Sequence, residues 1–170
     1  MTPTMQSQTI AQRITTRDGE FIAYYSERGL AGVNFPSHRS GLAGVRNDAP
    51  SAQVRRWHRA TTAAIQQTLA GRAAKNLPPL DLAGGTEFQR AVWAAMREIP
   101  AGQTRSYGEI ARLIGKPKAV RAVGGACGAN PIPVLVPCHR VLAANQKLGG
   151  FSSGLDWKRR LLEREGVIWL

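Results

Sequence analysis

The spacing of apolar side chains predicts a helix near the middle of the chain. Between residues 86 and 99 apolar positions recur every three or four residues, which is the repeat of one helix face. Thr86 and Gln89 have the spacing of a capping box, the side-chain and backbone exchange that begins many helices. Pro100 cannot continue a helix, so we expect this one to end there.

The next segment predicts two short helices joined by a tight turn. Ser106 and Glu109 have the spacing of a second capping box, and Gly115 suits the left-handed position that closes a helix. Pro117 is favourable at a first helical position, which predicts another helix from residue 118 to about 128. Two short helices around a Gly-containing turn are typical of a helix-turn-helix, although helical hairpins also occur in proteins that bind no nucleic acid.

The second of these helices is almost bare of large side chains. Most of its residues are glycine or alanine: Ala119, Ala122, Gly124, Gly125, Ala126, Gly128 and Ala129. Each glycine inside a helix costs about 1 kcal/mol relative to alanine, so something should offset that cost. Two explanations remain open. The helix packs tightly against a core element, or it closely approaches a ligand backbone or narrow groove, with Arg121 as its one long basic side chain.

The start of the chain has the pattern of a small antiparallel sheet. Residues 14–16 and 21–25 predict two strands around an Asp-Gly turn, the dipeptide favoured in tight hairpins. Residues 29–35 predict a third strand.

A loop and a helix follow the predicted strands. Residues 36–50 are rich in Ser, Gly and Asn and predict a loop, whereas residues 51–69 have the period of an amphipathic helix. Proline and glycine clusters then interrupt the chain, so we place a boundary near Gly85. This divides the chain into an α/β domain, residues 1–84, and a mainly helical domain, residues 85–170.

Composition narrows the class of protein. With 43% hydrophobic and 20% charged residues the chain is typical of a folded globular protein. No apolar run approaches the roughly 18 residues that span a membrane, and the first 14 residues lack a signal-peptide core. Two cysteines cannot form a disulfide framework. We therefore expect a cytoplasmic protein without membrane association.

The net charge of +12 points to a polyanionic partner such as nucleic acid. The segment 99–155 has one acid, Glu109, and seven basic residues: Arg105, Arg112, Lys116, Lys118, Arg121, Arg140 and Lys147. A solvated basic face that only keeps the protein soluble is the alternative explanation. The overlap of this segment with the predicted helix pair favours a nucleic-acid partner.

Residues 130–141 contain the best candidate for covalent chemistry. Val134–Val136 predicts a short buried strand that leads to Cys138 and His139. The imidazole and the guanidinium of Arg140 could lower the thiol pKa below the ~8.5 of free cysteine and so create a nucleophile. A buried structural cysteine beside a core histidine is the alternative.

Four motifs now support a family resemblance. Ser-Tyr-Gly-Glu-Ile-Ala, Arg-Ala-Val-Gly-Gly, Asn-Pro-Ile-Pro and Pro-Cys-His-Arg-Val occur in an order that closely resembles the O6-alkylguanine-DNA alkyltransferases. The resemblance is strong over residues 86–166, whereas the first 84 residues match only in size and strand content. It implies a ribonuclease-H-like α/β N-terminal domain, with a small antiparallel sheet and a helix, followed by a mainly α C-terminal domain with a helix-turn-helix.

The activity that the resemblance implies is DNA repair with a single turnover. Such a protein flips O6-alkylguanine, mainly O6-methylguanine, out of duplex DNA. It then transfers the alkyl group irreversibly to its own cysteine, as a methylated-DNA–protein-cysteine methyltransferase. No cofactor and no metal are implied.

The resemblance assigns four catalytic residues. Cys138 falls on the alkyl acceptor, and His139 falls on the base that takes the thiol proton through a water. Glu165 falls on the carboxylate that orients the histidine, an arrangement that stabilises imidazolium and hence thiolate. Tyr107 falls on the phenol that donates to guanine N3. Judged from the residues alone, Glu165 reads as a solvated helix end.

The implied partner is double-stranded DNA, bound through its minor groove by a monomer, with cooperative binding along DNA left open. Arg121 falls on the finger that fills the gap left by the flipped nucleotide, and flipping is required because O6 is inaccessible inside the duplex. The other implied DNA contacts are Ser106, Lys116, Lys118, Ala122 and Gly125. The implied substrate pocket comprises Asn130, Pro133, Val141, Phe151, Ser152 and Ser153.

Within that pocket the resemblance implies backbone contacts to the base. Asn130 would pin the turn before the cysteine. The carbonyls of Cys138 and Val141 would accept from the guanine amino group, and the Ser152 amide would donate to O6.

Three positions depart from common family patterns. Phe151 stands where tyrosine is frequent, Ser153 where glycine is frequent, and Gly128 where some members have a basic residue. The N-terminal half has no cysteine, which excludes the structural zinc of some relatives. A helix-turn-helix regulator or lesion binder with a structural Cys138, and a Cys-His-Glu hydrolase, are the competing function classes.

Overall fold

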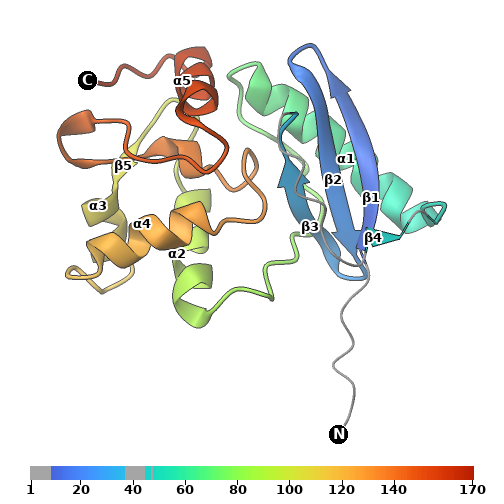
Figure 1. Cartoon of the computed structure of the whole chain (residues 1–170), viewed down its shortest axis with the longest axis horizontal. Coiled ribbons are helices and arrows are strands. Elements are labelled where there is room, and N and C mark those ends of the chain that lie inside the picture. Colours follow the sequence, from blue (N-terminus) through green and yellow to red (C-terminus); the bar gives the residue numbers. More distant parts are fainter. Residues whose placement is uncertain (1–8, 37–44, 47) are drawn as a thin grey trace, which may run out of the picture.

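The computed structural model describes residues 9–36, 45–46 and 48–170. Strands β1–β4 and helix α1 lie on one side of the molecule, and helices α2–α5 lie on the other (Figure 1). This arrangement agrees with the predicted order of an α/β region followed by a helical region. Among the described residues, no helix is long and apolar enough to cross a membrane.

The sheet has the order β3-β2-β1-β4. Strands β1 (Thr9–Thr16), β2 (Gly19–Ser26) and β3 (Gly29–Asn34) are antiparallel, and a hairpin pairs Thr16 with Gly19. The three predicted strands are therefore confirmed, although the first begins earlier than the apolar pattern indicated. The two-residue β4 (Val45–Arg46) pairs in parallel with β1 and lies inside the predicted 36–50 loop, most of whose other residues are outside the described ranges.

Helix α1 (Ala52–Leu69) confirms the amphipathic segment predicted at 51–69. The Ser51 side chain accepts from the backbone N–H of Val54 at 3.1 Å and begins the helix. Its buried face packs on the sheet through residues such as Ile65. From the sheet, the rings of Phe21 and Phe35 pack against Trp157 at centroid distances of 5.5 and 4.9 Å, so one continuous core joins the sheet to the helices.

The helical region follows the predicted capping signals. Helix α2 (Glu87–Arg97) begins at the Thr86–Gln89 capping box, and α3 (Tyr107–Leu113) begins at the Ser106–Glu109 box. Helix α3 ends at Gly115, whose φ of +75° fits the expected left-handed position. The last helix is α5 (Leu155–Arg164).

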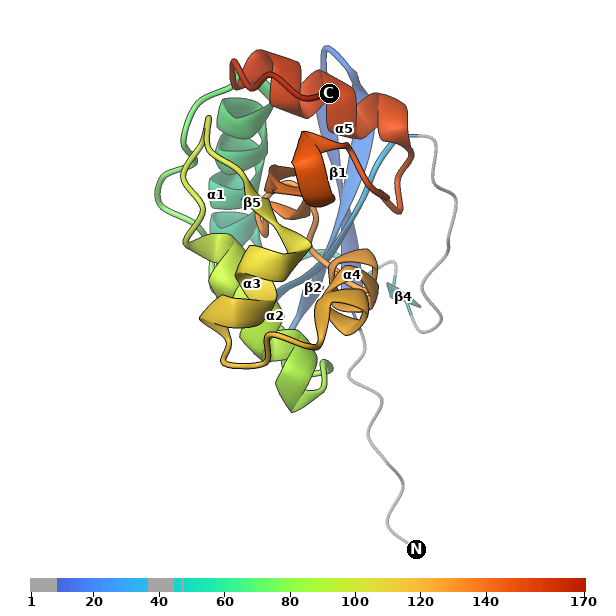
Figure 2. The same cartoon turned by 90° about the vertical axis from the view of Figure 1, so that its left-hand side faces the viewer.

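Helix α4 (Val120–Gly128) begins two residues later than predicted. The N–H of Ala119 donates to the Lys116 carbonyl at 2.9 Å, which closes a turn around Pro117 before the helix starts. Pro117 therefore lies in the connecting turn and not at the first helical position. Helices α3 and α4 pack side by side at the front of the molecule (Figure 2).

The strand predicted at Val134–Val136 is wrong. Val134 has a φ of +75°, and the Val136 N–H donates to the Ile132 carbonyl at 2.9 Å, so the chain turns tightly here. Prolines at 131, 133 and 137 lack the N–H groups that a strand ladder needs. The strand comes after the cysteine instead, where β6 (Val141–Leu142) pairs with β5 (Arg105–Ser106).

Candidate active site

Cys138 lies at the wall of a cavity of about 310 Å³. The thiol residue begins the 3-10 helix η1 (Cys138–Arg140) and is only 5% exposed. The cavity is lined by α3, α4, η1 and the loop before α5 through Tyr107, Gly124, Cys127, Gly128, Cys138, Gly150, Phe151 and Ser152. A nucleophile buried in a cavity formed by four elements can react only with a group that enters that cavity.

Asn130 holds the turn that delivers the cysteine. Its Nδ2 donates to the Val136 carbonyl at 2.8 Å, and its Oδ1 accepts from the Ile132 N–H at 3.0 Å. The same buried side chain hydrogen-bonds the Cys138 thiol. One amide thereby satisfies a proline-rich turn that has few backbone donors of its own.

His139 and Arg140, the two residues after Cys138, form a buried ionic cluster with Glu165. His139 Nε2 lies 2.9 Å from Glu165 Oε1, and both side chains are 0% exposed. Arg140 Nε and Nη2 donate to the same carboxylate at 2.8–3.2 Å, and Arg140 Nη1 donates to the Ile99 carbonyl at 2.8 Å. Glu165 is therefore no solvated helix end, and Arg140, counted with the basic surface in the sequence, is buried and committed to this cluster.

The end of α5 fixes Glu165 in place. Glu165 is the C-cap residue, and Gly166 follows it with a φ of +74°. The Gly166 and Val167 N–H groups donate back to the Glu163 and Leu162 carbonyls, each at 3.0 Å, which is a Schellman ending. The carboxylate thus projects from a helix terminus that these two backbone hydrogen bonds close.

The protonation states in the cluster follow from burial and pairing. Burial favours a neutral Glu165, but hydrogen bonds from His139 and Arg140 outweigh it and lower the pKa to about 2. Burial lowers the pKa of His139, against the opposing effect of Glu165, so the imidazole is neutral beside an ionised carboxylate. The Nδ1 atom of His139 is buried and has no hydrogen-bond partner among the described residues. With Nε2 engaged by Glu165, Nδ1 is the nitrogen that can accept a proton.

The pKa of the Cys138 thiol is shifted in the direction opposite to the one expected from the sequence. Burial raises the pKa of Cys138, while the Asn130 hydrogen bond, Lys158 and nearby backbone groups oppose that rise. The resting thiol therefore keeps its proton, and forming a thiolate requires a base.

Tyr107 lines the cavity, and Lys158 holds the backbone of Gly150, another lining residue. Burial raises the pKa of Tyr107, whose hydroxyl forms a hydrogen bond with the Gly150 backbone. Lys158 is fully buried, and its Nζ donates to the carbonyls of Val141 and Gly150 at 2.7 and 3.0 Å. Burial lowers the pKa of Lys158 to about 8. One ammonium thus joins the strand after the cysteine to the loop that carries the pocket wall.

Lys158 is a site residue that no sequence motif predicted. Its position relative to Leu161, Leu162 and Glu165 has helical i, i+3, i+4 and i+7 spacing, which marks it as part of the inward face of α5. A lysine at a position of the apolar helix face could have indicated a buried and functionally important ammonium group.

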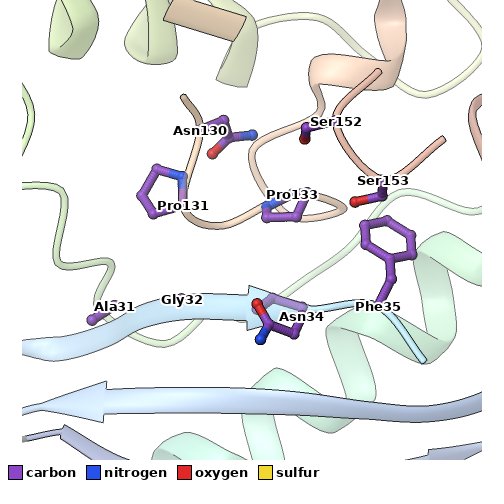
Figure 3. A pocket seen from close by; sticks show the side chains of 10 residues that line it. Ala31, Gly32, Asn34, Phe35, Asn130, Pro131, Pro133, Ser152 and Ser153 are labelled. Atoms are coloured by element: carbon purple, nitrogen blue, oxygen red, sulfur yellow. The ribbon is translucent and has the colours of Figure 1, made fainter. Parts of the chain in front are cut away.

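Five of the six predicted pocket residues line one or both of two cavities, and the sixth, Val141, lines neither. Phe151 and Ser152 line the Cys138 cavity. Asn130, Pro133 and Ser153, again with Ser152, line a second cavity of about 210 Å³ against β3 (Figure 3). Val141 is buried, and its carbonyl accepts from Lys158.

Known proteins resemble both halves of this chain. Residues 87–167 match the family "6-O-methylguanine DNA methyltransferase, DNA binding domain". A structure of Mycobacterium tuberculosis OGT in complex with DNA is 36% identical, covers 92% of both chains and superposes with a TM-score of 0.79. The chain belongs to the O6-methylguanine-DNA methyltransferase family.

Further relatives support that family assignment. The methylated-DNA–protein-cysteine methyltransferase of Methanosarcina acetivorans is 63% identical over 48% of this chain and 53% of the relative. The enzyme of the same name from Salmonella typhimurium is 47% identical over 62% of this chain and 64% of its own. The chain therefore matches only about half to two-thirds of the length of these curated relatives.

In this O6-methylguanine-DNA methyltransferase family member, the predicted DNA-contact residues lie mostly on an open surface. Lys116 and Lys118 are exposed in the turn before α4, and Arg121, Ala122 and Gly125 are exposed on the helix. Ser106 differs, because its hydroxyl accepts from the Glu109 N–H at 3.1 Å as the cap of α3.

The glycines of α4 bear on the two explanations left open by the sequence. A Cβ built on Gly124, Gly125 or Gly128 meets no other described atom within 4 Å. These glycines are therefore not required by packing inside the protein. The explanation by tight packing is thus not supported at these three positions.

The described residues contain no group of three or more His, Cys, Asp or Glu side chains able to hold a metal ion.

Proposed function

We propose that this protein repairs DNA by transferring the alkyl group of O6-alkylguanine, mainly O6-methylguanine, to Cys138 in a single turnover. The observation that carries the proposal is the position of the Cys138 thiol. Cys138 lines a cavity together with Gly124 and Gly128 of α4, and the next residue in the chain, His139, is paired with Glu165. The names of the relatives support methyl transfer from DNA to cysteine as the activity.

In the proposed reaction His139 acts as the base. The thiol proton passes through a water to His139 Nδ1, and the ionised Glu165 stabilises the resulting imidazolium. The thiolate attacks the alkyl carbon, a carbon–sulfur bond forms, and the carbon–oxygen bond breaks with its electron pair left on guanine. The product is a thioether without an evident leaving route, so each molecule acts once.

Tyr107 and the pocket loop would assist departure of the guanine. The raised pKa keeps the Tyr107 phenol protonated near neutral pH, so its hydroxyl can donate to guanine N3. The Ser152 amide would donate to O6, and the Val141 carbonyl keeps one lone pair for the amino group while Lys158 uses the other.

The proposed DNA interface is the α3–α4 pair, acting as a helix-turn-helix on the minor groove. A recognition helix that reads the major groove needs polar side chains, whereas α4 presents glycine and alanine around Arg121. Arg121 is exposed at the start of this face and would fill the gap left by the flipped nucleotide. Arg121→Ala should therefore slow repair of duplex DNA more than reaction with free O6-benzylguanine.

The remaining expectations are part of the same proposal. We infer a ribonuclease-H-like N-terminal unit, supported by three antiparallel strands with a parallel fourth and one packed helix. We further propose a cytoplasmic monomer, with a domain boundary near residue 85.

The test is the intact mass of the protein after incubation with duplex DNA containing O6-methylguanine. One methyl group per molecule is expected, and peptide mapping should place it on Cys138. Cys138→Ser should bind the DNA and gain no mass, while Cys127→Ser, changed in the same cavity, should still gain one methyl group. Repeated turnover, or a methyl group on Cys127, would contradict the proposal.

A further inference from the structure

The last turn of α5 is bound to the hairpin of the N-terminal sheet. Arg164 Nη2 and Nη1 donate to Asp18 Oδ1 and Oδ2 at 2.6 and 2.8 Å, a two-pronged ion pair across 146 positions of sequence. The Asp18 side chain is only 9% exposed. In Figure 1 the β1–β2 turn, which contains Asp18, and α5 both lie at the top of the molecule.

The end of α1 also meets this turn of α5. Arg164 Nη1 donates to the Leu69 carbonyl at 3.0 Å. Gly71, just beyond α1, has a φ of +75°, and a Cβ there would lie 1.9 Å from the Arg164 carbonyl oxygen. The backbones of the two helix ends are therefore in direct contact, and the N-terminal region holds α5 by a side chain and by its main chain.

The residue after Arg164 is Glu165, whose carboxylate receives His139 and Arg140. From one helix terminus, Arg164 thus binds the N-terminal hairpin while Glu165 binds the residues that follow Cys138. Because the Schellman ending makes that terminus rigid, a displacement of Arg164 must move Glu165 relative to His139. A misplacement of reacting groups by about 1 Å can cost up to about 100-fold in rate.

We propose that Asp18 is a positioning residue for Glu165, so that the N-terminal region sets the geometry of the His139–Glu165 pair. Its effect on alkyl transfer rests on the proposed function, whereas its effect on the histidine hydrogen bond does not. The device is a clamp of four contacts: the Asp18–Arg164 ion pair, a longer Asp18–Arg160 ion pair at 3.8 Å, the Arg164–Leu69 hydrogen bond and the Gly71 backbone contact.

The first test compares Asp18→Asn with Glu20→Gln in single-turnover repair at saturating DNA. Glu20 is the matched control, because it lies in the same hairpin and forms an exposed ion pair with Arg13 at 3.7 Å that reaches no part of α5. Asp18→Asn should lower the maximal transfer rate about three- to tenfold without changing the dissociation constant for DNA, and Glu20→Gln should change neither. Asp18→Glu, which restores the carboxylate, should recover part of the rate.

A double mutant distinguishes an effect of Asp18 through Glu165 from a general effect on the structure. In a Glu165→Gln background, Asp18→Asn should cause no further loss of rate, since the residue acts through Glu165. An unchanged rate in the single mutant, or the full loss repeated in the double mutant, would overturn the proposal. If Asp18→Asn lowers the yield of folded protein, Arg164→Lys serves instead, because it keeps the charge and loses the two-pronged geometry.

A second readout does not depend on repair. The proton on His139 Nε2, observed by NMR of the full chain, should be shifted downfield and protected from exchange by the bond to Glu165. Asp18→Asn should speed its exchange with water, and Glu20→Gln should not. A wild-type protein with this signal but no alkyl transfer would refute the proposed function and leave the clamp intact. Equal signals in all three proteins would refute the clamp.

Discussion

At the scale of single residues, Glu165 owes its low pKa to donors that only the folded chain supplies. His139, Arg140 and the Gly102 N–H all donate to one carboxylate, and the side chains of Glu165 and His139 are both 0% exposed. Burial alone would push this pKa upward, so the ionised state persists because the hydrogen bonds outweigh desolvation.

A test of this pairing is the rate of alkyl transfer in His139→Ala, Glu165→Gln and their double mutant. Each single change should lower the rate about 10- to 100-fold, because the base is lost or its imidazolium is no longer stabilised. Since the two residues act as a unit, the double mutant should lose much less than the product of the single losses. Multiplying losses, measured in single-turnover kinetics, would mean that Glu165 does not act through the histidine.

The same carboxylate predicts an acid limb in the stability of the protein. The pKa of Glu165 falls from an ordinary 4.5 to about 2 in the fold, so its contribution is complete above 4.5 and lost as the pH falls toward 2. The shift corresponds to roughly 3 kcal/mol. Urea unfolding between pH 6 and 3 should show a steeper loss of stability in wild type than in Glu165→Gln. Parallel curves for the two proteins would contradict this assignment.

At the scale of elements, helix α4 has one side buried in the core. Its other side is rich in glycine, and at these glycines no neighbouring atom of the described residues would prevent a larger side chain. Val123, Ala126 and Cys127 face the core, and the Ala126 carbonyl accepts from Trp93 Nε1 at 2.8 Å. The glycines occupy the exposed or cavity-lining positions. Such a helix is a poor helix former by composition and is kept in place by α2 and α3.

Gly125 allows the two demands on α4 to be separated. Gly125→Ala should raise the free energy of unfolding by about 0.5–1 kcal/mol, because alanine favours the helix and its Cβ meets open space. DNA affinity should fall, and should fall further in Gly125→Leu, if the surface lies against the nucleic-acid backbone. Thermal unfolding and fluorescence anisotropy with duplex DNA measure the two effects. Unchanged affinity in Gly125→Leu would place the DNA elsewhere.

Sequence patterns predicted these elements where local chemistry decides the structure. The capping boxes at Thr86 and Ser106 and the closing Gly115 occur as expected, because each depends on residues within one turn. The strand predicted before Cys138 was wrong, because the prolines in that apolar run lack the N–H donors that a strand needs. The bonds that Asn130 supplies there cross the turn and cannot be inferred from periodicity.

At the scale of the whole molecule, the site depends on contacts between distant segments. Lys158 and Arg140 are basic in sequence but buried in the fold, and the Asp18–Arg164 pair joins opposite ends of the chain. No local pattern reveals such pairings. The family resemblance pointed to Glu165 beside His139 and to Asn130 at the turn, whereas Lys158, the buried Arg140 and the Asp18–Arg164 pair became visible only in the fold. Phe151 moreover lines the cavity and packs on Phe35 of the N-terminal region, with the two ring centroids 5.9 Å apart.

Phe35 provides a test of this dependence. Its ring contacts Phe21, Phe151 and Trp157, so Phe35→Ala should lower the free energy of unfolding by about 3–5 kcal/mol. Far-UV circular dichroism and tryptophan fluorescence should report one coincident transition in both proteins, because the core is continuous. Two separate transitions in the wild type would show that the sheet and the helices unfold independently.

The ending of α5 also makes the length of that helix a functional quantity. Each residue turns an α-helix by about 100°, so one alanine inserted within α5 would rotate every later side chain by that angle around the axis. Arg164 would then leave Asp18 and Glu165 would leave His139 together, even though every catalytic residue remained in the protein. The length of α5 between Gly154 and Gly166 therefore sets where both side chains lie. Substitutions at its exposed positions should disturb the proposed alkyl-transfer site far less than an inserted or deleted residue.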